Sequence, residues 1–196
     1  MNAIAESTTE QTPTGERAEL IATLERHRGF LLQTADALTE EQARTASTVS
    51  ELTIASLLKH VADTEEQWFR FAVEGTEAFG LDHEVYGDVD WDAIDAASDD
   101  GGQPAAEWVD TRFVLAEHET LDHLRTRMEQ VAARTEQVLR SADLDSAHPL
   151  PVAPWFEPGV SWSVRRVAIH VLAEISQHAG HADIIREAID GRKTMG

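Results

Sequence analysis

The chain has 196 residues, and none of them is cysteine. Without cysteine it can form no disulfide framework, no cysteine-ligated metal site and no cysteine nucleophile. If the protein performs thiol chemistry, the thiol must therefore arrive as a small molecule.

Basic residues are scarce as well. The 16 lysines and arginines face 36 aspartates and glutamates, which gives a formal net charge of -20. So few cations cannot neutralise a row of phosphates, which argues against nucleic acid as a partner. The same shortage argues against an anionic membrane surface. The acidic surplus indicates a well-solvated surface.

Long apolar runs are also missing. No segment approaches the ~18 consecutive apolar residues of a membrane span. The N-terminus lacks the basic-then-apolar order of a secretion signal, so we expect a cytoplasmic protein. Residues 1–14 are polar and rich in Thr and Glu, which predicts a disordered tail before one domain over residues 15–196.

Apolar residues recur with the helical period in four segments, and no segment shows the period of a strand. The segments lie between Leu20 and Leu38, between Ile54 and Ala72 after Thr53 as N-cap, between Leu121 and Leu139, and from a cap at Ser161 or Ser163 to about Asp190. The third helix can begin as early as Pro104, because proline is favoured in the first turn of a helix. The pattern predicts an all-α protein, a four-helix bundle with long connections after the second and third helices.

The connections have distinctive compositions. Thr39 to Gln42 has the form of a capping box and predicts a short helical turn. Residues 81–102 are crowded with aspartate, but the residue order of an EF-hand calcium loop is absent. Residues 148–159 are rich in proline and predict an irregular link.

The fourth helix carries four side chains that can bind a metal. His170, Glu174, His178 and His181 recur at i, i+4, i+8 and i+11, which places them on one stripe of the helix. That stripe borders an apolar stripe, so we expect it to face the bundle interior. In the alternative interpretation, Glu174 and His178 form only a hydrogen-bonded pair one turn apart.

A third ligand is available from the second helix. His60 lies in the amphipathic segment Leu-Leu-Lys-His-Val-Ala-Asp. If the second and fourth helices are neighbours, His60, Glu174 and His178 supply three ligands and leave one position open, as in a catalytic zinc site. Imidazole and carboxylate also suit nickel, iron and manganese, so the residues do not select the metal.

The residues near this stripe leave several roles open. His181 could replace Glu174 as a ligand, or act as an acid, a base or an orienting donor. His170 could orient Glu174. Gly180 predicts the close approach of a neighbouring helix, because glycine otherwise weakens a helix. Asp183 and Arg186 are expected to form a surface pair.

Two segments together resemble one family of helical bundles. The first is the Leu-Leu-Lys-His-Val-Ala-Asp segment around His60, followed by Trp-Phe-Arg-Phe at residues 68–71. The second runs from Trp162 through His178-Ala-Gly-His181 to Glu187. They resemble the DinB-like metal-dependent superfamily, and most closely its mycothiol-dependent branch of actinobacteria. The resemblance extends over the chain after the N-terminal tail.

The resemblance implies which residues bind the metal. The family places one ligand on the second helix and a pair at i, i+4 on the last helix, and the matching positions are His60, Glu174 and His178. Many members carry histidine at the first position of the pair. Glutamate at that position resembles the mycothiol-dependent isomerases. Despite the family's DNA-damage-derived name, neither charge nor motif supports DNA binding.

The function implied is that of a metal-dependent enzyme that uses a low-molecular-weight thiol, mycothiol, on a small electrophile. We expect a divalent metal, zinc first and nickel, iron or manganese as alternatives, with His181 as proton shuttle. The thiolate would attack the electrophile in S-transfer or add reversibly to a double bond in isomerisation. The alternatives are a metal-dependent hydrolase with the same ligands and a metal-binding bundle without turnover.

Two further expectations concern the surroundings of the site. Trp68, Trp155 and Phe156 are candidates to wall the pocket, although plain core or loop packing is the favoured explanation for each of them. The resemblance, together with the apolar and aromatic content of the second helix, suggests a homodimer.

Overall fold

The computed structural model describes residues 13–79, 111–151 and 156–194. Three expectations lie outside these residues: most of the tail at 1–14, the aspartate-rich stretch at 81–102, and a helix start at Pro104. Among the described residues, no helix is both long enough and apolar enough to cross a membrane.

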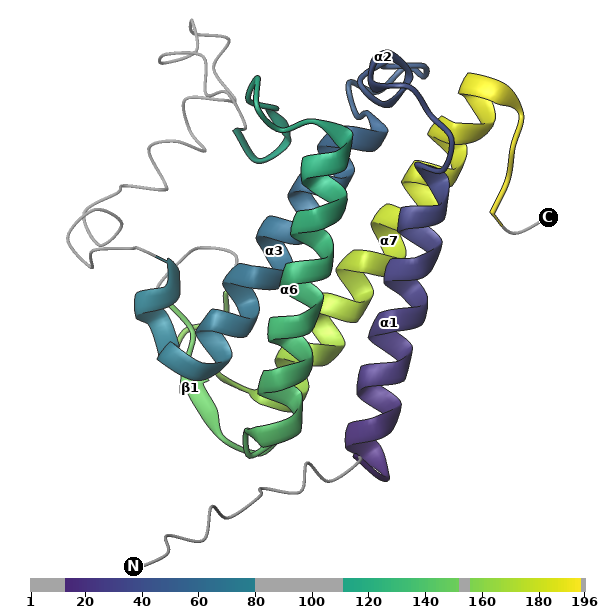
Figure 1. Cartoon of the computed structure of the whole chain (residues 1–196). Coiled ribbons are helices and arrows are strands. Elements are labelled where there is room, and N and C mark those ends of the chain that lie inside the picture. Colours follow the sequence, from purple (N-terminus) through teal and green to yellow (C-terminus); the bar gives the residue numbers. More distant parts are fainter. Residues whose placement is uncertain (1–12, 80–110, 152–155, 195–196) are drawn as a thin grey trace, which may run out of the picture.

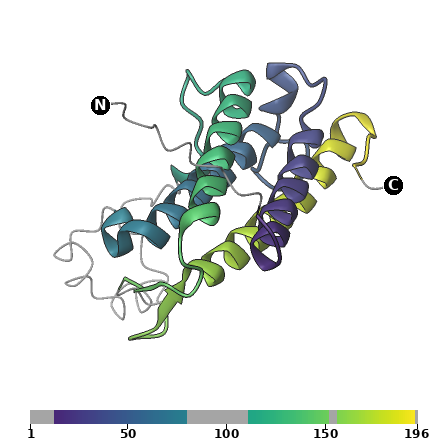
Figure 2. The ribbon, with the colours of Figure 1, turned by 60° about the horizontal axis from the view of Figure 1, so that its bottom comes forward.

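Four long helices form the predicted bundle, which confirms the all-α fold class (Figure 1). They are α1 (Glu16–Thr34), α3 (Ile54–Glu74), α6 (Leu121–Ser141) and α7 (Val164–Asp190). Helix α7 packs against both α1 and α3, and α3 also packs against α6. The arrangement is visible from two directions in Figures 1 and 2.

The helix ends follow the local signals in the sequence. Thr53 caps α3 by accepting a hydrogen bond from the Ser56 backbone, and Ser163 caps α7 in the same way. Thr39 forms the predicted capping box at α2 (Glu40–Ala43). Gly191 ends α7 with a φ of 78°, a left-handed conformation that favours glycine. Each N-cap is worth about 1 kcal/mol.

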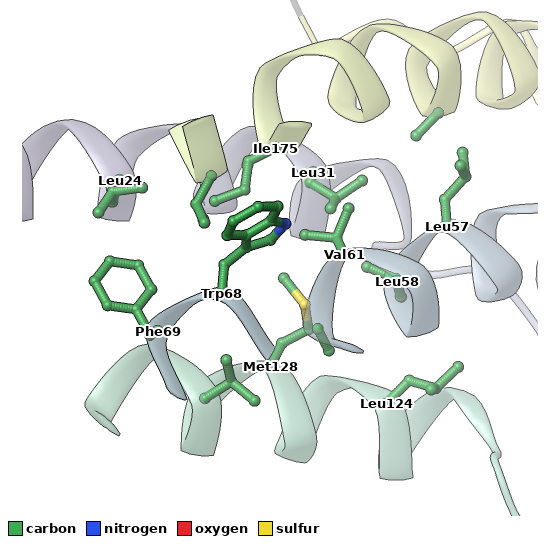
Figure 3. Close-up of a cluster of buried hydrophobic side chains, with 14 of the residues drawn as sticks. Leu24, Leu31, Leu57, Leu58, Val61, Trp68, Phe69, Leu124, Met128 and Ile175 are labelled. Atoms are coloured by element: carbon green, nitrogen blue, oxygen red, sulfur yellow. The ribbon is translucent and has the colours of Figure 1, made fainter. Parts of the chain in front are cut away.

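The core lies between the four helices, and α3 contributes most to it (Figure 3). Apolar side chains from all four helices are almost fully buried; they include Leu24, Leu31, Leu57, Leu58, Val61, Phe71, Leu124, Met128, Val171 and Ile175. Since α3 is buried on most of its faces, it is the central element of the bundle.

A buried polar network crosses this core. Arg28 of α1 donates to Glu65 of α3 from Nε and Nη2, with its shortest contacts at 2.9 Å. Thr135 of α6 donates to the same carboxylate at 2.6 Å. The Glu65 side chain is only 1% exposed. The network therefore ties three helices together around one buried charge pair.

One sequence expectation about the connections was wrong. A short antiparallel pair, β1 (Ala147–Pro149) with β2 (Ser161–Ser163), joins the two ends of the proline-rich link, where no strand was predicted. Pro149 is tolerated because it ends a strand at the edge of a two-stranded sheet. Helix α6 begins at Leu121, where the helical period begins, and a 3₁₀ turn at η2 (Thr111–Phe113) precedes it. A second 3₁₀ turn, η1 (Gly75–Phe79), follows α3.

Two expectations on α7 were also wrong. A Cβ added at Gly180 would meet nothing within 4 Å, so no neighbouring helix in the described structure approaches it closely. Arg186 forms no surface pair with Asp183. It is 2% exposed and donates to the carbonyls of Thr34 and Asp36, which closes the end of α1 against α7.

Candidate metal centre

The three predicted ligands meet between α3 and α7. The ligating atoms of His60, Glu174 and His178 all lie within 4.8 Å of one another. His60 is 6% and His178 is 8% exposed, so both imidazoles are buried. The condition set by the sequence, that the second and fourth helices be neighbours, is met because α3 packs against α7.

Local sequence explains why these side chains converge. The cap at Thr53 fixes the start of α3, which turns His60 inward beside the buried Leu57 and Val61. On α7, Ile175 and His178 belong to the buried stripe, and Glu174 lies at its margin with a side chain 28% exposed. Ligands from two helices therefore face one another across the seam between them.

The carboxylate of Glu174 is the centre of the cluster. Its Oε2 lies 3.7 Å from His178 Nε2 and 3.9 Å from His60 Nε2, and these separations are too long for hydrogen bonds. Two ligands bound at about 2.1 Å in a tetrahedral site lie roughly 3.4 Å apart. The two separations from Glu174 are within about half an ångström of that spacing, and all three pairs lie within 4.8 Å, so the side chains fit a divalent cation after they move closer together.

The charge of the cluster also suits a cation. His178 first, and then His60, hold the pKa of Glu174 well below its usual range, against the opposing effect of burial. Glu174 is therefore ionised at neutral pH. One carboxylate and two imidazoles match the nitrogen and oxygen ligands found around zinc.

His170 lies beside the cluster rather than in it. Its Nε2 is 3.9 Å from Glu174 Oε1, the oxygen that faces away from the other two histidines. Burial lowers the pKa of His170, opposed by the charge of Glu174. Its ring contacts Trp68 and Trp162, with centroids 4.6 and 5.0 Å away. His170 therefore connects the ligands to an aromatic wall.

His181 contacts the opposite edge of a ligand. Its Nδ1 lies 3.4 Å from Nδ1 of His178, whose Nε2 faces Glu174. A proton on Nδ1 of His178 leaves the Nε2 lone pair free for a metal, and such a partner commonly fixes that tautomer. The cluster of converging atoms contains Glu174 and not His181. The role of His181 as proton shuttle stays a prediction.

Two residues at the site were missed from the sequence. Phe113 of η2 stacks on the His60 ring, with centroids 4.3 Å apart and planes at 26°. Thr64 Oγ1 lies 3.5 Å from His60 Nε2. The spacing of Thr64, one turn after His60, was an available signal. Phe113 had none, because it lies outside any periodic segment.

The three residues expected to wall the pocket differ in where the structure places them. Trp68 is 7% exposed and stacks on Trp162 at 4.8 Å, and among the described rings it connects to the candidate ligands through His170. Phe156 lies 6.1 Å from Trp68 and belongs to the same aromatic group. Trp155 lies outside the described residues. Ordinary packing therefore accounts for much of what Trp68 does.

A cavity of about 400 Å³ lies elsewhere, between α1 and α6, and Arg28 and Thr135 contribute to its lining. None of the three candidate ligands lines it. The cavity is therefore separate from the candidate metal centre.

The chain has the helical bundle of the DinB-like class, with a His–Glu–His cluster between α3 and α7. Within that class, the family model described as mycothiol-S-transferase matches residues 19–191, which include α3, α7 and all three candidate ligands. The chain belongs to the mycothiol-S-transferase family. That description points to a thiol-dependent transferase activity in the family.

The comparison with solved structures supports the fold alone. A crystal structure described as the conserved protein of locus from Enterococcus faecalis aligns with a TM-score of 0.61 and 15% identity. The alignment covers 92% of this chain and 100% of that chain. No curated protein matches the sequence.

Proposed function

We propose that this protein is a metal-dependent enzyme that joins mycothiol to a small electrophile by S-transfer. The observation that carries the proposal is the convergence of His60, Glu174 and His178 within 4.8 Å. Membership in the mycothiol-S-transferase family indicates mycothiol as the thiol, and the absence of cysteine is consistent with a thiol from outside the chain.

Zinc is the metal that we propose first, with nickel, iron and manganese as alternatives. When bound, a divalent cation deprotonates a coordinating thiol and so supplies the nucleophile. Three protein ligands leave a position open for the thiol.

Several residues of the chain act around this open coordination position. Glu174 contributes the single negative charge of the ligand set, held ionised by the two histidines. Phe113 covers one face of His60 and limits the access of water. His181 contacts Nδ1 of His178, where it can hold that ring in place. We propose His181 as an acid–base residue as well, which a shift in the pH profile of His181→Gln would reveal.

The test is conjugate formation with mycothiol and a simple alkylating electrophile such as iodoacetamide, followed by mass spectrometry. We expect wild-type protein loaded with zinc to accelerate the reaction, and His60→Ala and His178→Ala to lose the acceleration. His118→Ala is the matched control, because His118 is exposed and contacts only His123 among the described rings.

The other functions are tested with other substrates. With a cis-alkene conjugated to a carbonyl group, cis–trans conversion that needs thiol but leaves no stable conjugate would favour isomerisation. Ester hydrolysis that is independent of thiol but lost in His60→Ala would favour a hydrolase. Zinc binding with no turnover of either kind would leave a metal-binding bundle, and the proposal would be wrong.

A further inference from the structure

Helix α7 carries a cation on the same side as the candidate ligands. Arg166, His170, Glu174 and His178 follow one another at intervals of four residues. Residues at this spacing are neighbours on a helix surface. With a rise of 1.5 Å per residue, Arg166 starts about 12 Å along the axis from Glu174.

The guanidinium of Arg166 is held in place by an aromatic ring. It lies over Trp162, 4.6 Å from the ring centroid, and Trp162 in turn stacks on the buried Trp68. A cation–π contact of this kind uses the face of the ring and leaves the N–H donors of the guanidinium available. Arg166 therefore presents a positioned fork of donors.

No acidic side chain in the described part of the chain pairs with that fork. Arg166 is exposed, and its side chain forms no ion pair or hydrogen bond with a described residue. The neighbouring Arg165 differs, because it pairs with both Glu16 and Asp145. Within the described residues, the donors of Arg166 are therefore available to an anion from outside the chain.

An aromatic path joins Arg166 to the cluster. His170 lies between them, 3.9 Å from Glu174 Oε1 and in edge contact with Trp162. The path suits a flat, apolar group. Its two ends suit different chemistry: a reacting atom at the ligands and a carboxylate at the guanidinium, which binds carboxylates through two parallel hydrogen bonds.

We propose that Arg166 is a specificity-determining residue that binds the carboxylate of an aromatic acid electrophile, an inference that rests on the proposed S-transfer. The ring contacts at 4.6 and 5.0 Å place the guanidinium within about 10 Å of the His170 ring. A 4-carboxybenzyl thioether, about 7 Å from sulfur to carboxylate, is of comparable length. With 4-(bromomethyl)benzoate, a bond forms between the thiol sulfur and the benzylic carbon. The carbon–bromine bond breaks, bromide leaves, and the thiol proton passes to solvent.

The experiment measures binding of the two products by calorimetry, with zinc-loaded full-length protein. The ligands are the 4-carboxybenzyl conjugate of mycothiol and its 4-carbamoylbenzyl counterpart, which has the same shape without the charge. We expect wild type to prefer the carboxylate by about tenfold, the range of one charge-assisted hydrogen-bonded pair. We expect Arg166→Gln to bring that preference to about one.

Arg165→Gln is the matched control and should retain the preference, because Arg165 is engaged by Glu16 and Asp145. The shorter carboxymethyl conjugate should show no preference over its amide, since its charge cannot reach Arg166. Equal binding of both benzyl conjugates by wild type, or a preference that persists in Arg166→Gln, would overturn the inference while leaving S-transfer intact. Failure of wild type to bind any mycothiol conjugate would overturn the proposed function and the inference with it.

Discussion

Helix α3 carries two buried polar clusters five residues apart, and they are built in opposite ways. At Glu65, Arg28 donates to both carboxylate oxygens and Thr135 adds a third partner at 2.6 Å. At His60, the nearest carboxylate oxygen of Glu174 is 3.9 Å away, beyond hydrogen-bond reach. One cluster is closed by direct bonds, and the other leaves a gap at its centre.

The difference separates a structural role from a binding role. Buried polar groups in proteins are almost always hydrogen-bonded. The Glu65 cluster satisfies this rule within the protein and ties α1, α3 and α6 together. In the His60 cluster the imidazoles have longer contacts, 3.5 Å to Thr64 and 3.4 Å to His181, and no direct hydrogen bond joins the three candidate ligands. Because both belong to α3, the closed cluster also holds the helix on which the open one depends.

The largest expected effect is on metal binding. His60→Ala and His178→Ala should each lower metal content from about one equivalent per chain to near zero, because each removes one of three ligands. Elemental analysis of the purified proteins measures this. Glu174→Gln should weaken binding without abolishing it, since an amide oxygen can coordinate but carries no charge.

Undiminished metal in both histidine variants would contradict the site. Loss of metal in His181→Ala together with retention in Glu174→Ala would transfer the ligand role to His181. Glu65→Gln changes the closed cluster on the same helix and should keep its metal. It therefore shows whether loss of metal is specific to the candidate ligands.

The next effect is on stability. Glu65→Gln should lower the free energy of unfolding by about 3–5 kcal/mol, because it leaves the buried Arg28 without its counter-charge. Urea unfolding at neutral pH measures the change. Glu74→Gln is the control on the same helix: it removes an exposed pair with Arg70 and should cost less than about 1 kcal/mol. A loss at Glu65 as small as that at Glu74 would contradict the structural role.

The two clusters should also differ in their response to acid. The folded protein holds the pKa of Glu174 below its ordinary value of 4.5, so this carboxylate stabilises the fold above pH 4.5. That stability is lost as pH falls through the lower, folded pKa. Without metal, wild type should therefore exceed Glu174→Gln in stability above pH 4.5 and lose this advantage in stronger acid.

Urea unfolding of the two metal-free proteins across this pH range measures the advantage. Glu51→Gln is the control, because Glu51 is exposed. An advantage of wild type over Glu174→Gln that does not change with pH would contradict the depressed pKa.

The sequence predicted what depends on local signals. Helix periods and caps such as Thr53, Ser163 and Gly191 are set by residues within one or two turns, and the structure has them as expected. The candidate ligands followed from spacing on single helices and from the family resemblance. Their meeting required one tertiary fact, the packing of α3 on α7.

The sequence failed where partners are distant along the chain. Arg28 and Glu65 are 37 positions apart, and no local pattern links them. Arg186 looked like a partner of Asp183 but reaches carbonyl groups at the end of α1. The strands β1 and β2 have three residues each, too few for a period to be visible.

The smallest predicted effect tests the outer side of α7, two residues beyond His178. Gly180 is exposed, lies in the middle of the helix, and has free space around the position of a Cβ. Gly180→Ala should therefore raise the free energy of unfolding by about 0.5–1 kcal/mol, because alanine has less conformational freedom to lose. Metal content should not change. Thermal and urea unfolding measure the gain.

Gly191→Ala is the comparison variant with the opposite expected sign. The φ of 78° at position 191 strains any residue with a Cβ, so this substitution should destabilise the protein by about 1 kcal/mol. A loss of stability in Gly180→Ala as well would mean that something covers this side of α7. The exposed Ile184, one turn further along and 63% accessible, lies on the same side. A second copy of the chain, in the homodimer expected from the sequence, is then the first candidate, and a concentration-dependent loss would identify it because dissociation depends on protomer concentration.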